Sequence, residues 1–212
     1  MEGKKRERYW GAFACTYDDG AEYVVGKALR QAILHRLSEE RDLGDTVEFG
    51  CGTGYFTTAL AVNAASLTAT DLSDEMLAVA RVRLKDFSRV TISKTDCEGT
   101  PFTPESFDTV FMANVLHTIR NPRKALQESY RILKDGGLLL IVLYTDFGMS
   151  WFEKMELALR YFVTFGMPPP HGLKNYSPDE LGSLVRSVGF NNVEIQLLGD
   201  KPKALYLRGR KA

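Results

Sequence analysis

Short apolar runs alternate with helical repeats between about residues 20 and 145, and this order constrains the fold more than any other feature. The apolar runs predict strands at residues 46–49, 66–71, 90–93, 107–112 and 138–144. Apolar residues at helical spacing predict helices at residues 21–37, 55–63, 73–84 and 122–133. Alternating strands and helices indicate βαβ units, so we expect a mostly parallel sheet with helices on both faces.

The remainder of the chain lacks this alternation. Residues 151–165 are a helical segment rich in aromatic residues, and a loop with several prolines follows it. Ser177 before Pro178 predicts a further helix. Two late strands, at residues 193–198 and 204–208, are close enough to form a hairpin. With the five earlier strands, this predicts a seven-stranded sheet that ends in a β-hairpin.

The helical segment at residues 151–165 has apolar residues on more than one face. One stripe comprises Trp151, Met155, Ala158, Phe162 and Phe165, and another comprises Phe152, Leu159 and Val163. We expect one stripe to pack in the core and the other to cover a substrate or to meet a partner chain. Packing of both stripes in the core is the alternative.

Charge and cysteine content limit the possible partners and the location. Lys plus Arg and Asp plus Glu number 27 each, so no net field attracts nucleic acid or an anionic membrane. The basic ends, residues 1–8 and 201–211, are expected to be solvated. The longest apolar run is too short to span a bilayer. The three cysteines lack metal-ligand spacing and the N-terminus lacks a signal-peptide core, which favours a cytoplasmic protein without metal, nucleic acid or membrane partners.

Three glycines, Gly50, Gly52 and Gly54, follow the first expected strand. Their spacing allows a tight turn and close approach of a ligand to the backbone. A dinucleotide fingerprint would need a glycine at position 55, which is Tyr55, and the lysine of a phosphate-binding loop is absent as well. An ordinary tight turn is the alternative to a binding loop.

Two acids near this loop define the ligand that it suits. Glu48 stands two residues before the first glycine, where a carboxylate repels pyrophosphate and favours an ammonium group. Asp71 ends the second expected strand, where a carboxylate accepts hydrogen bonds from ribose hydroxyls. The pocket therefore suits a nucleoside that has a ribose, no phosphate and a zwitterionic tail. S-adenosylmethionine has these parts.

Four segments in order carry a resemblance to a known family. They read VEFGCGTGYFT, TATDLSDEMLAVAR, TDCEGTPFTPESFDTVFMANVLHTIRNP and ALQESYRILKDGGLLLIV. They resemble the class I S-adenosylmethionine-dependent methyltransferases, in particular the small-molecule type related to ubiquinone and menaquinone biosynthesis enzymes. The resemblance runs from about Tyr9 to Leu143 and more loosely to the C-terminus. It implies an α/β, Rossmann-like, doubly wound fold in a single domain, residues 1–212, with a helical cap at residues 1–40. We expect a helical lid at residues 145–176, because this aromatic-rich segment follows the fifth strand and so leaves the sheet at its carboxyl edge.

The resemblance also assigns roles to individual residues. The methionine part would be held by Glu48, the glycine loop and the main chain of Asn114, and the ribose by Asp71. Leu72 and Met76 would line the adenine face, and Asp96 with the Cys97 backbone would contact its edge. Tyr17 would close over the cofactor. The expected cofactor-binding residues are thus Tyr17, Glu48, Gly50, Cys51, Gly52, Gly54, Asp71, Leu72, Met76, Asp96, Cys97 and Asn114.

The implied reaction is methyl transfer from S-adenosylmethionine to a small, largely apolar or aromatic acceptor by in-line displacement. Such a step needs an aligned nucleophile more than a strong base. His117, Tyr17 and Tyr144 are the candidate catalytic residues, although a helix-capping or structural role suits His117 better than that of a base, and His171 is expected to be a solvated loop residue. The acceptor atom and the oligomeric state stay open.

Two other functions compete with methyl transfer. One is a non-catalytic S-adenosylmethionine-binding module that regulates a partner protein through the aromatic helix. The other is a nucleotide-dependent reductase, which Glu48 and Tyr55 disfavour. The Pro-Pro-Tyr signature of methylases that act on amide or base nitrogens is absent, since the corresponding segment reads MANVLH.

Overall fold

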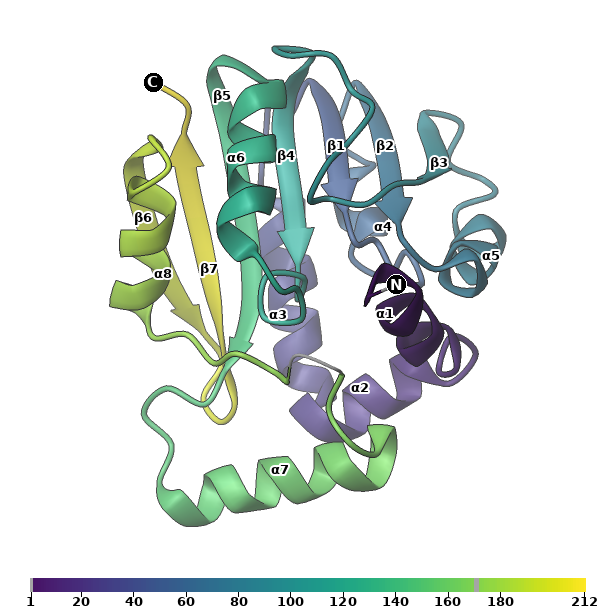
Figure 1. Cartoon of the computed structure of the whole chain (residues 1–212), viewed down its shortest axis with the longest axis vertical. Helices are drawn as coiled ribbons and strands as arrows, with labels where there is room; N and C mark the ends of the chain where they lie inside the picture. The colour runs from purple at the N-terminus through teal and green to yellow at the C-terminus, as the bar shows by residue number, and fades with distance from the viewer. Residues whose placement is uncertain (1, 170–171) are drawn as a thin grey trace.

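The computed structural model describes residues 2–169 and 172–212, and a seven-stranded sheet is its frame (Figure 1). The strand order is β3-β2-β1-β4-β5-β7-β6. The strands are β1 (Asp45–Phe49), β2 (Ser66–Asp71), β3 (Val90–Lys94), β4 (Phe107–Ala113), β5 (Leu133–Thr145), β6 (Asn191–Leu198) and β7 (Lys203–Arg210). The first five are parallel, and β7 is antiparallel to both of its neighbours. The expected doubly wound sheet with its terminal hairpin is confirmed.

Helices cover both faces of this sheet. They are α1 (Glu2–Gly11), α2 (Tyr17–Val25), α3 (Lys27–Ser38), α4 (Thr57–Leu60), α5 (Asp74–Arg83), α6 (Pro122–Ile132), α7 (Trp151–Phe165) and α8 (Pro178–Arg186). One apolar cluster joins the sheet to α3, α4 and α5, and a second joins the opposite face to α6 and α8. The segments of the described chain that close the remaining edge are α1, α2 and α7, beyond the carboxyl ends of the parallel strands (Figure 1).

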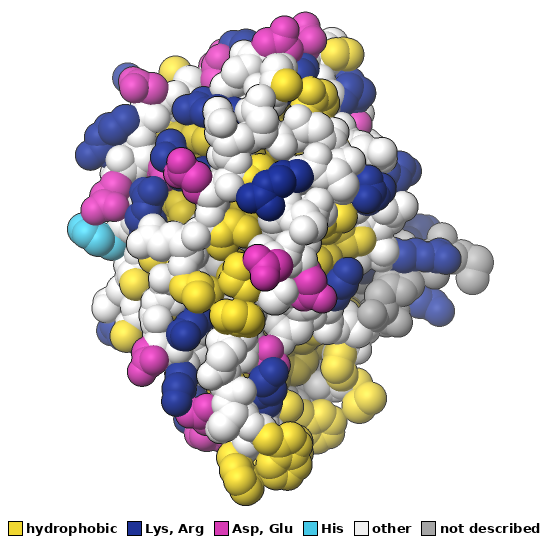
Figure 2. Space-filling model, turned by 90° about the vertical axis from the view of Figure 1, so that its left-hand side faces the viewer, with side chains coloured by type: hydrophobic (Ala, Val, Ile, Leu, Met, Phe, Trp, Pro, Cys, Tyr) yellow, Lys and Arg dark blue, Asp and Glu magenta, His cyan; other side chains and the backbone are white. Residues whose placement is uncertain are grey.

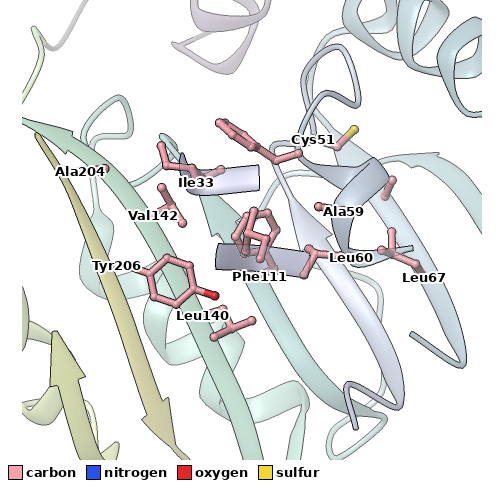
Figure 3. Close-up of a cluster of buried hydrophobic side chains, with 14 of the residues drawn as sticks. Ile33, Cys51, Ala59, Leu60, Leu67, Phe111, Leu140, Val142, Ala204 and Tyr206 are labelled. Atoms are coloured by element: carbon pink, nitrogen blue, oxygen red, sulfur yellow. The ribbon is translucent and has the colours of Figure 1, made fainter. Parts of the chain in front are cut away.

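The continuous apolar run of β5 reflects burial on both of its faces. Leu140 and Val142 belong to the first cluster, whereas Leu139 and Ile141 belong to the second. Figure 3 shows the first cluster, in which Ile33 of α3 lies over side chains of the central strands. Alternate residues of a strand point to opposite faces, so a strand covered on both sides has no polar positions in its middle.

Three local expectations differ from the structure. The helix expected at residues 21–37 is two helices, because the backbone of Gly26 has a φ of 87° and breaks the helix there. The helix expected at residues 55–63 contracts to Thr57–Leu60. The strand expected at residues 138–144 begins earlier, at Leu133, and in this added part Gly136 has a φ of 72° and donates its N–H to Lys211 O at 3.2 Å.

The two basic ends are not simply solvated. Arg6 of α1 is 13% exposed and pairs with Asp96 and Glu98, at 3.1 Å in each case. At the other end, the Lys211 ammonium is buried and donates to Leu133 O at 2.8 Å. Long-range contacts that a sequence pattern does not show therefore fix both ends.

The helix α7 packs against α2 through a side that differs from the expected one. Phe165 is buried, and its ring lies 5.3 Å from that of Phe13, 5.7 Å from that of Tyr17 and 5.2 Å from that of Tyr161. The other members of both expected stripes are exposed, so the prediction that one stripe packs in the core was wrong, and so was its alternative that both do. Apolar residues cover more of this helix than its buried side can accommodate, so many of them face solvent. Within the described residues, no helix is long and apolar enough to cross a membrane.

Two phenylalanines of α7 provide a matched test of this packing. Phe165 is 5% exposed and Phe162 is 54% exposed. Phe165→Ala should lower the free energy of unfolding by about 2–4 kcal/mol because it empties the centre of an aromatic cluster. Phe162→Ala should change it by less than about 1 kcal/mol, since its ring already contacts water. Urea denaturation of both variants measures the difference, and equal losses would contradict this packing.

Candidate functional site

A cavity opens at the carboxyl edge of the sheet, between β1 and β4, where the strand order reverses. Ligands of open parallel sheets bind at such points. Ten expected cofactor-binding residues line the cavity, namely Tyr17, Glu48, Gly50, Cys51, Gly52, Asp71, Leu72, Met76, Cys97 and Asn114. Gly54 and Asp96 are the two expected residues that lie outside its lining.

Glu48 is a buried carboxyl group on the cavity wall. It is 1% exposed, and Thr57 Oγ1 donates a hydrogen bond of 2.6 Å to its Oε2. Burial raises the pKa of Glu48 to about 8, the hydrogen bond from Thr57 opposes this shift, and the negative charge of Asp71 adds to it. A group in this state gains from a positively charged ligand, which would stabilise its ionised form.

Asp71 joins three segments at the cavity wall. Its Oδ2 accepts the N–H of Gly52 and its Oδ1 accepts the N–H of Ser73, at 2.9 Å in each case. Burial raises the pKa of Asp71, and these backbone hydrogen bonds partly offset the shift. Each carboxylate oxygen has a second lone pair, so the group can still accept hydrogen bonds from a diol.

The three glycines of the loop are required for three different reasons. All have positive φ, at 70° for Gly50, 53° for Gly52 and 78° for Gly54. A Cβ on Gly50 would lie 2.3 Å from Val115 Cγ2, whereas one on Gly52 would meet nothing within 4 Å and would project into open space. A Cβ on Gly54 would lie 3.0 Å from Leu84 Cδ1, so this glycine allows close packing on α5 instead of ligand contact.

Asp96 belongs to a neighbouring surface. Its Oδ1 accepts hydrogen bonds from Arg6 and from the N–H of Glu98, both at 3.1 Å. The adjacent Cys97 lines the cavity, and burial raises the pKa of its thiol to about 12. Burial also raises the pKa of the Cys51 thiol, so both cysteines are neutral small residues and poor nucleophiles.

The candidate catalytic residues separate into two groups. Tyr17 and Tyr144 line the cavity, but His117 does not. Burial raises the pKa of Tyr17 to about 12 and also raises that of Tyr144, so both are neutral phenols near pH 7. Burial lowers the pKa of His117 to about 4, and its buried Nδ1 has no hydrogen-bond partner in the described chain. His171 lies outside the described residues.

Asn114 shapes the loop after β4. It has a φ of 57°, and its Oδ1 accepts the N–H of Tyr144 at 3.0 Å. Its own N–H donates to Val142 O at 2.8 Å. These two bonds tie the ends of β4 and β5 together, which holds Tyr144 at the cavity.

A partly buried ionic cluster beside the cavity was not predicted from the sequence. The Asp18 carboxylate pairs with Arg30 and Arg83, at 2.7 Å in each case, and also accepts from Thr53 of the glycine loop. Arg30 is 2% exposed, lines the cavity and lies 3.7 Å from the ring centroid of Tyr55. Its position on the apolar face of a predicted helix was the only available signal, because a buried arginine needs a partner.

Comparison with known proteins agrees with this geometry. A family model described as a methyltransferase domain matches residues 47–141. A ubiquinone/menaquinone biosynthesis C-methyltransferase, UbiE of Bordetella avium, is 31% identical over 224 residues, which cover 91% of this chain and 84% of that protein. This chain belongs to the class I S-adenosylmethionine-dependent methyltransferases.

Two further matches have a narrower meaning. A demethylmenaquinone methyltransferase of Clavibacter sepedonicus is 39% identical over 95 residues, which are 45% of this chain and only 39% of that protein. A methyltransferase of Thermotoga maritima, described as a possible histamine N-methyltransferase, has a TM-score of 0.75. At 24% identity, with 97% of this chain and 99% of that chain covered, it supports the fold of the methyltransferase.

The residues of the cavity fit the cofactor. Glu48, a buried acid without a cationic partner among the described residues, suits the cationic part of S-adenosylmethionine. The second acid at a strand end suits its diol, and the open glycine backbone suits its amino-acid part. When bound, this cofactor supplies an electrophilic methyl group on a positively charged sulfur. The protein supplies the carboxyl groups, the backbone and the walls that orient it.

The raised pKa of Glu48 predicts a pH dependence of stability. The pKa is about 8 in the folded chain against 4.5 for the free group. Between these values the folded state binds more protons than the unfolded state, so the free energy of unfolding should fall as the pH rises. Glu48→Gln should lack this fall and gain roughly 2–4 kcal/mol over the wild type between pH 5 and pH 8.5. Denaturation at a series of pH values tests this, and parallel curves would contradict it.

Two similar substitutions in the glycine loop should differ in their effects on stability and on cofactor binding. Gly50→Ala combines a clash with Val115 and strained backbone, and should lower the free energy of unfolding by about 2–4 kcal/mol. Gly52→Ala has strained backbone alone and should cost only about 1–2 kcal/mol, but its methyl group would enter the cavity. Calorimetry with S-adenosylhomocysteine should show at least about tenfold weaker binding for Gly52→Ala. Unchanged affinity would place the cofactor elsewhere.

Proposed function

We propose that this methyltransferase acts on a small, largely apolar or aromatic acceptor that enters the cavity beside the glycine loop. The observation that carries this proposal is the apolar part of the cavity lining. Phe56, Val115, Ile119 and the rings of Tyr17 and Tyr144 form it together with Trp10. The names of the relatives support this class, because they refer to demethylmenaquinone and to ubiquinone and menaquinone biosynthesis.

The cofactor would lie along the glycine loop. We assign Glu48, Cys51, Asn114 and the backbone of the loop to its amino-acid part and Asp71 to its ribose. Leu72 and Met76 would contact the adenine face, with Asp96 and the Cys97 backbone at its edge. Gly54 would serve only by packing the loop on α5.

Arg30 is an addition to this set. Two of its nitrogens bind Asp18, but its buried Nε has no hydrogen-bond partner within the described residues. Because Arg30 lines the cavity, we assign it to the carboxylate of the amino-acid tail.

Apolar walls suit in-line displacement at a sulfonium. Positive charge is lost during this reaction, so a dry environment favours the transition state over the charged ground state. The neutral phenols of Tyr17 and Tyr144 can donate a hydrogen bond to the nucleophile but cannot remove its proton near pH 7. Alignment is thus the main contribution of these side chains to the rate.

The cover of the cavity differs from the expected lid. Trp10 of α1 and Tyr17 and Ala21 of α2 line the cavity, whereas no residue of α7 is part of its lining. We assign residues 1–40 to an inner cap and residues 145–176 to an outer brace that acts through Phe165, in one domain of residues 1–212. We keep the cytoplasm as the proposed location and nucleic acid as an unsuitable partner, on the balanced charge.

A radiochemical assay tests this function. The full chain is incubated with S-adenosylmethionine labelled in its methyl group and with quinol, phenol, amine and fatty-acid acceptors. Transfer to an aromatic acceptor, with a product heavier by one methylene unit, is the expected result. Cofactor binding with no transfer to any acceptor or cell extract would favour the non-catalytic module that regulates a partner protein.

Two variants examine how the acceptor is held. Tyr144→Phe should lower kcat/KM about two- to tenfold because it removes one neutral hydrogen bond, which corresponds to a loss of roughly 0.5–1.5 kcal/mol of transition-state stabilisation. The affinity for S-adenosylhomocysteine should stay within about twofold. His117→Gln is the matched control, since His117 does not line the cavity. A large loss for His117→Gln with none for Tyr144→Phe would contradict these assignments.

A further inference from the structure

The outward side of α7 is a continuous apolar surface. Six large side chains are each between 52% and 78% exposed, namely Trp151, Phe152, Met155, Leu159, Phe162 and Val163. Figure 2 shows hydrophobic side chains projecting at the lower end of the molecule, where α7 lies in Figure 1. Six exposed residues of this kind on one helix are far more than the scattered apolar residues of an ordinary surface.

Helical geometry places these six residues together. At about 100° of rotation per residue, they and Ala158 fall within an arc of about 140°. None of the four charged residues of the helix lies within that arc, and Glu156 and Lys154 lie beyond its two edges. We call these seven residues the α7 apolar arc.

The charges beside the arc neutralise one another. Each charged residue of α7 has an ion-pair partner of opposite sign. The pairs are Glu153–Lys201 at 2.7 Å, Lys154–Asp146 at 3.2 Å and Glu156–Arg160 at 2.5 Å. The helix therefore presents apolar surface without a field that would attract an anionic partner.

We propose that the α7 apolar arc binds the surface of a bilayer of zwitterionic phospholipids, which carry no net charge, with the helix lying flat in the interface. The arc is too wide for a second copy of the same helix, because a helix pair uses only the narrow seam of a coiled coil. A 15-residue helix also supplies few turns to such a seam. Lipid is deformable and can cover the whole convex arc to a depth of about 5–10 Å.

This inference goes beyond the proposed acceptor. We expected no membrane partner because the chain has no net charge and no spanning segment. The zero net charge argues against electrostatic attraction to a bilayer, and the lack of a spanning segment argues against insertion across it. Shallow burial of one helix in the interface requires neither. The paired charges predict binding that depends on lipid packing and little on anionic lipid.

The place of the arc gives this binding a consequence for the reaction. Phe165 at the end of α7 contacts Trp10 and Tyr17, and both of these line the cavity. This aromatic layer connects α7 to the cavity wall. An apolar acceptor dissolved in lipid would then have a short path to the site, a consequence that rests on the proposed function, whereas the binding itself does not.

Vesicle flotation with the full chain tests the binding without acceptor or cofactor. The probes are small, loosely packed vesicles of dioleoylphosphatidylcholine, with and without phosphatidylserine. We expect flotation with both, changed by less than about twofold when salt rises from about 0.05 to 0.5 M. No flotation at millimolar lipid would overturn the proposal. Flotation only with phosphatidylserine, lost in salt, would also overturn it.

Matched variants assign the binding to the arc. Phe152→Ser with Leu159→Gln should weaken flotation at least about thirtyfold, since each buried side chain of this size contributes roughly tenfold or more. Val62→Ser with Val82→Gln is the control, because these residues are 70% and 72% exposed elsewhere on the molecule. The control should float like the wild type. Equal losses, or none in either, would overturn the assignment to α7.

Sedimentation velocity on the same proteins tests other occupants of the arc. A dimer of the wild type that the Phe152 and Leu159 variant abolishes, without flotation of either, would assign the arc to a second copy. Both variants should keep the wild-type affinity for S-adenosylhomocysteine and the same transfer to a water-soluble acceptor. Loss of flotation alone would therefore leave the proposed function intact, and loss of transfer in the wild type would leave the lipid inference intact.

Discussion

Parallel pairing of β1 with β2 and with β4 is the constraint on which the site depends. The register sets Phe49 opposite Thr70 on one side and opposite Met112 on the other. All three strands therefore end at the same level, and the chain leaves each of them toward the same edge. Cys51 N donates to Thr70 O at 2.8 Å, which lays the glycine loop beside the end of β2. The short side chain of Asp71 can therefore reach the Gly52 amide and accept its hydrogen bond.

Buried charge determines what this edge can bind. The negative charge of Asp71 raises the pKa of Glu48, and Arg30, a cation that lines the same cavity, is already paired with Asp18. Burial raises the pKa of Asp71 and the charge of Arg6 acts to lower it, whereas Glu48 has no ion-pair partner within the described residues. Burying an acid without a partner costs stability unless a ligand supplies the opposite charge. The site consequently favours a cationic ligand over a phosphate before any specific contact is counted.

Local patterns predicted the frame of this protein, and with the family resemblance they placed ten of the twelve expected cofactor-binding residues in the cavity lining, but they failed where distant segments meet. The strands follow from apolar runs, and Ser73 caps α5 as its position before the helix predicts. The pairing of Asp18 with Arg30 crosses the break at Gly26, which no helical period reveals. The orientation of α7 could not be predicted because a helix that is apolar on several faces has no unique buried side. Contacts of Phe165 with α1 and α2 decide it.

The contact between Arg6 and Asp96 joins the N-terminal cap to the proposed adenine edge. Arg6 and the Glu98 amide both donate to Oδ1 of Asp96. Among the described residues no hydrogen bond to Oδ2 of this carboxylate is seen, so Oδ2 can accept one from a ligand. An adenine amino group at Oδ2 would therefore not displace Arg6. Instead, the cofactor would lie against Arg6 and Trp10, which already line the cavity. Trp10 also contacts Phe165 of α7. A ligand that stabilises the position of α1 would therefore also stabilise the packing of α7. Cofactor binding and the position of the outer helix are then coupled through one aromatic cluster.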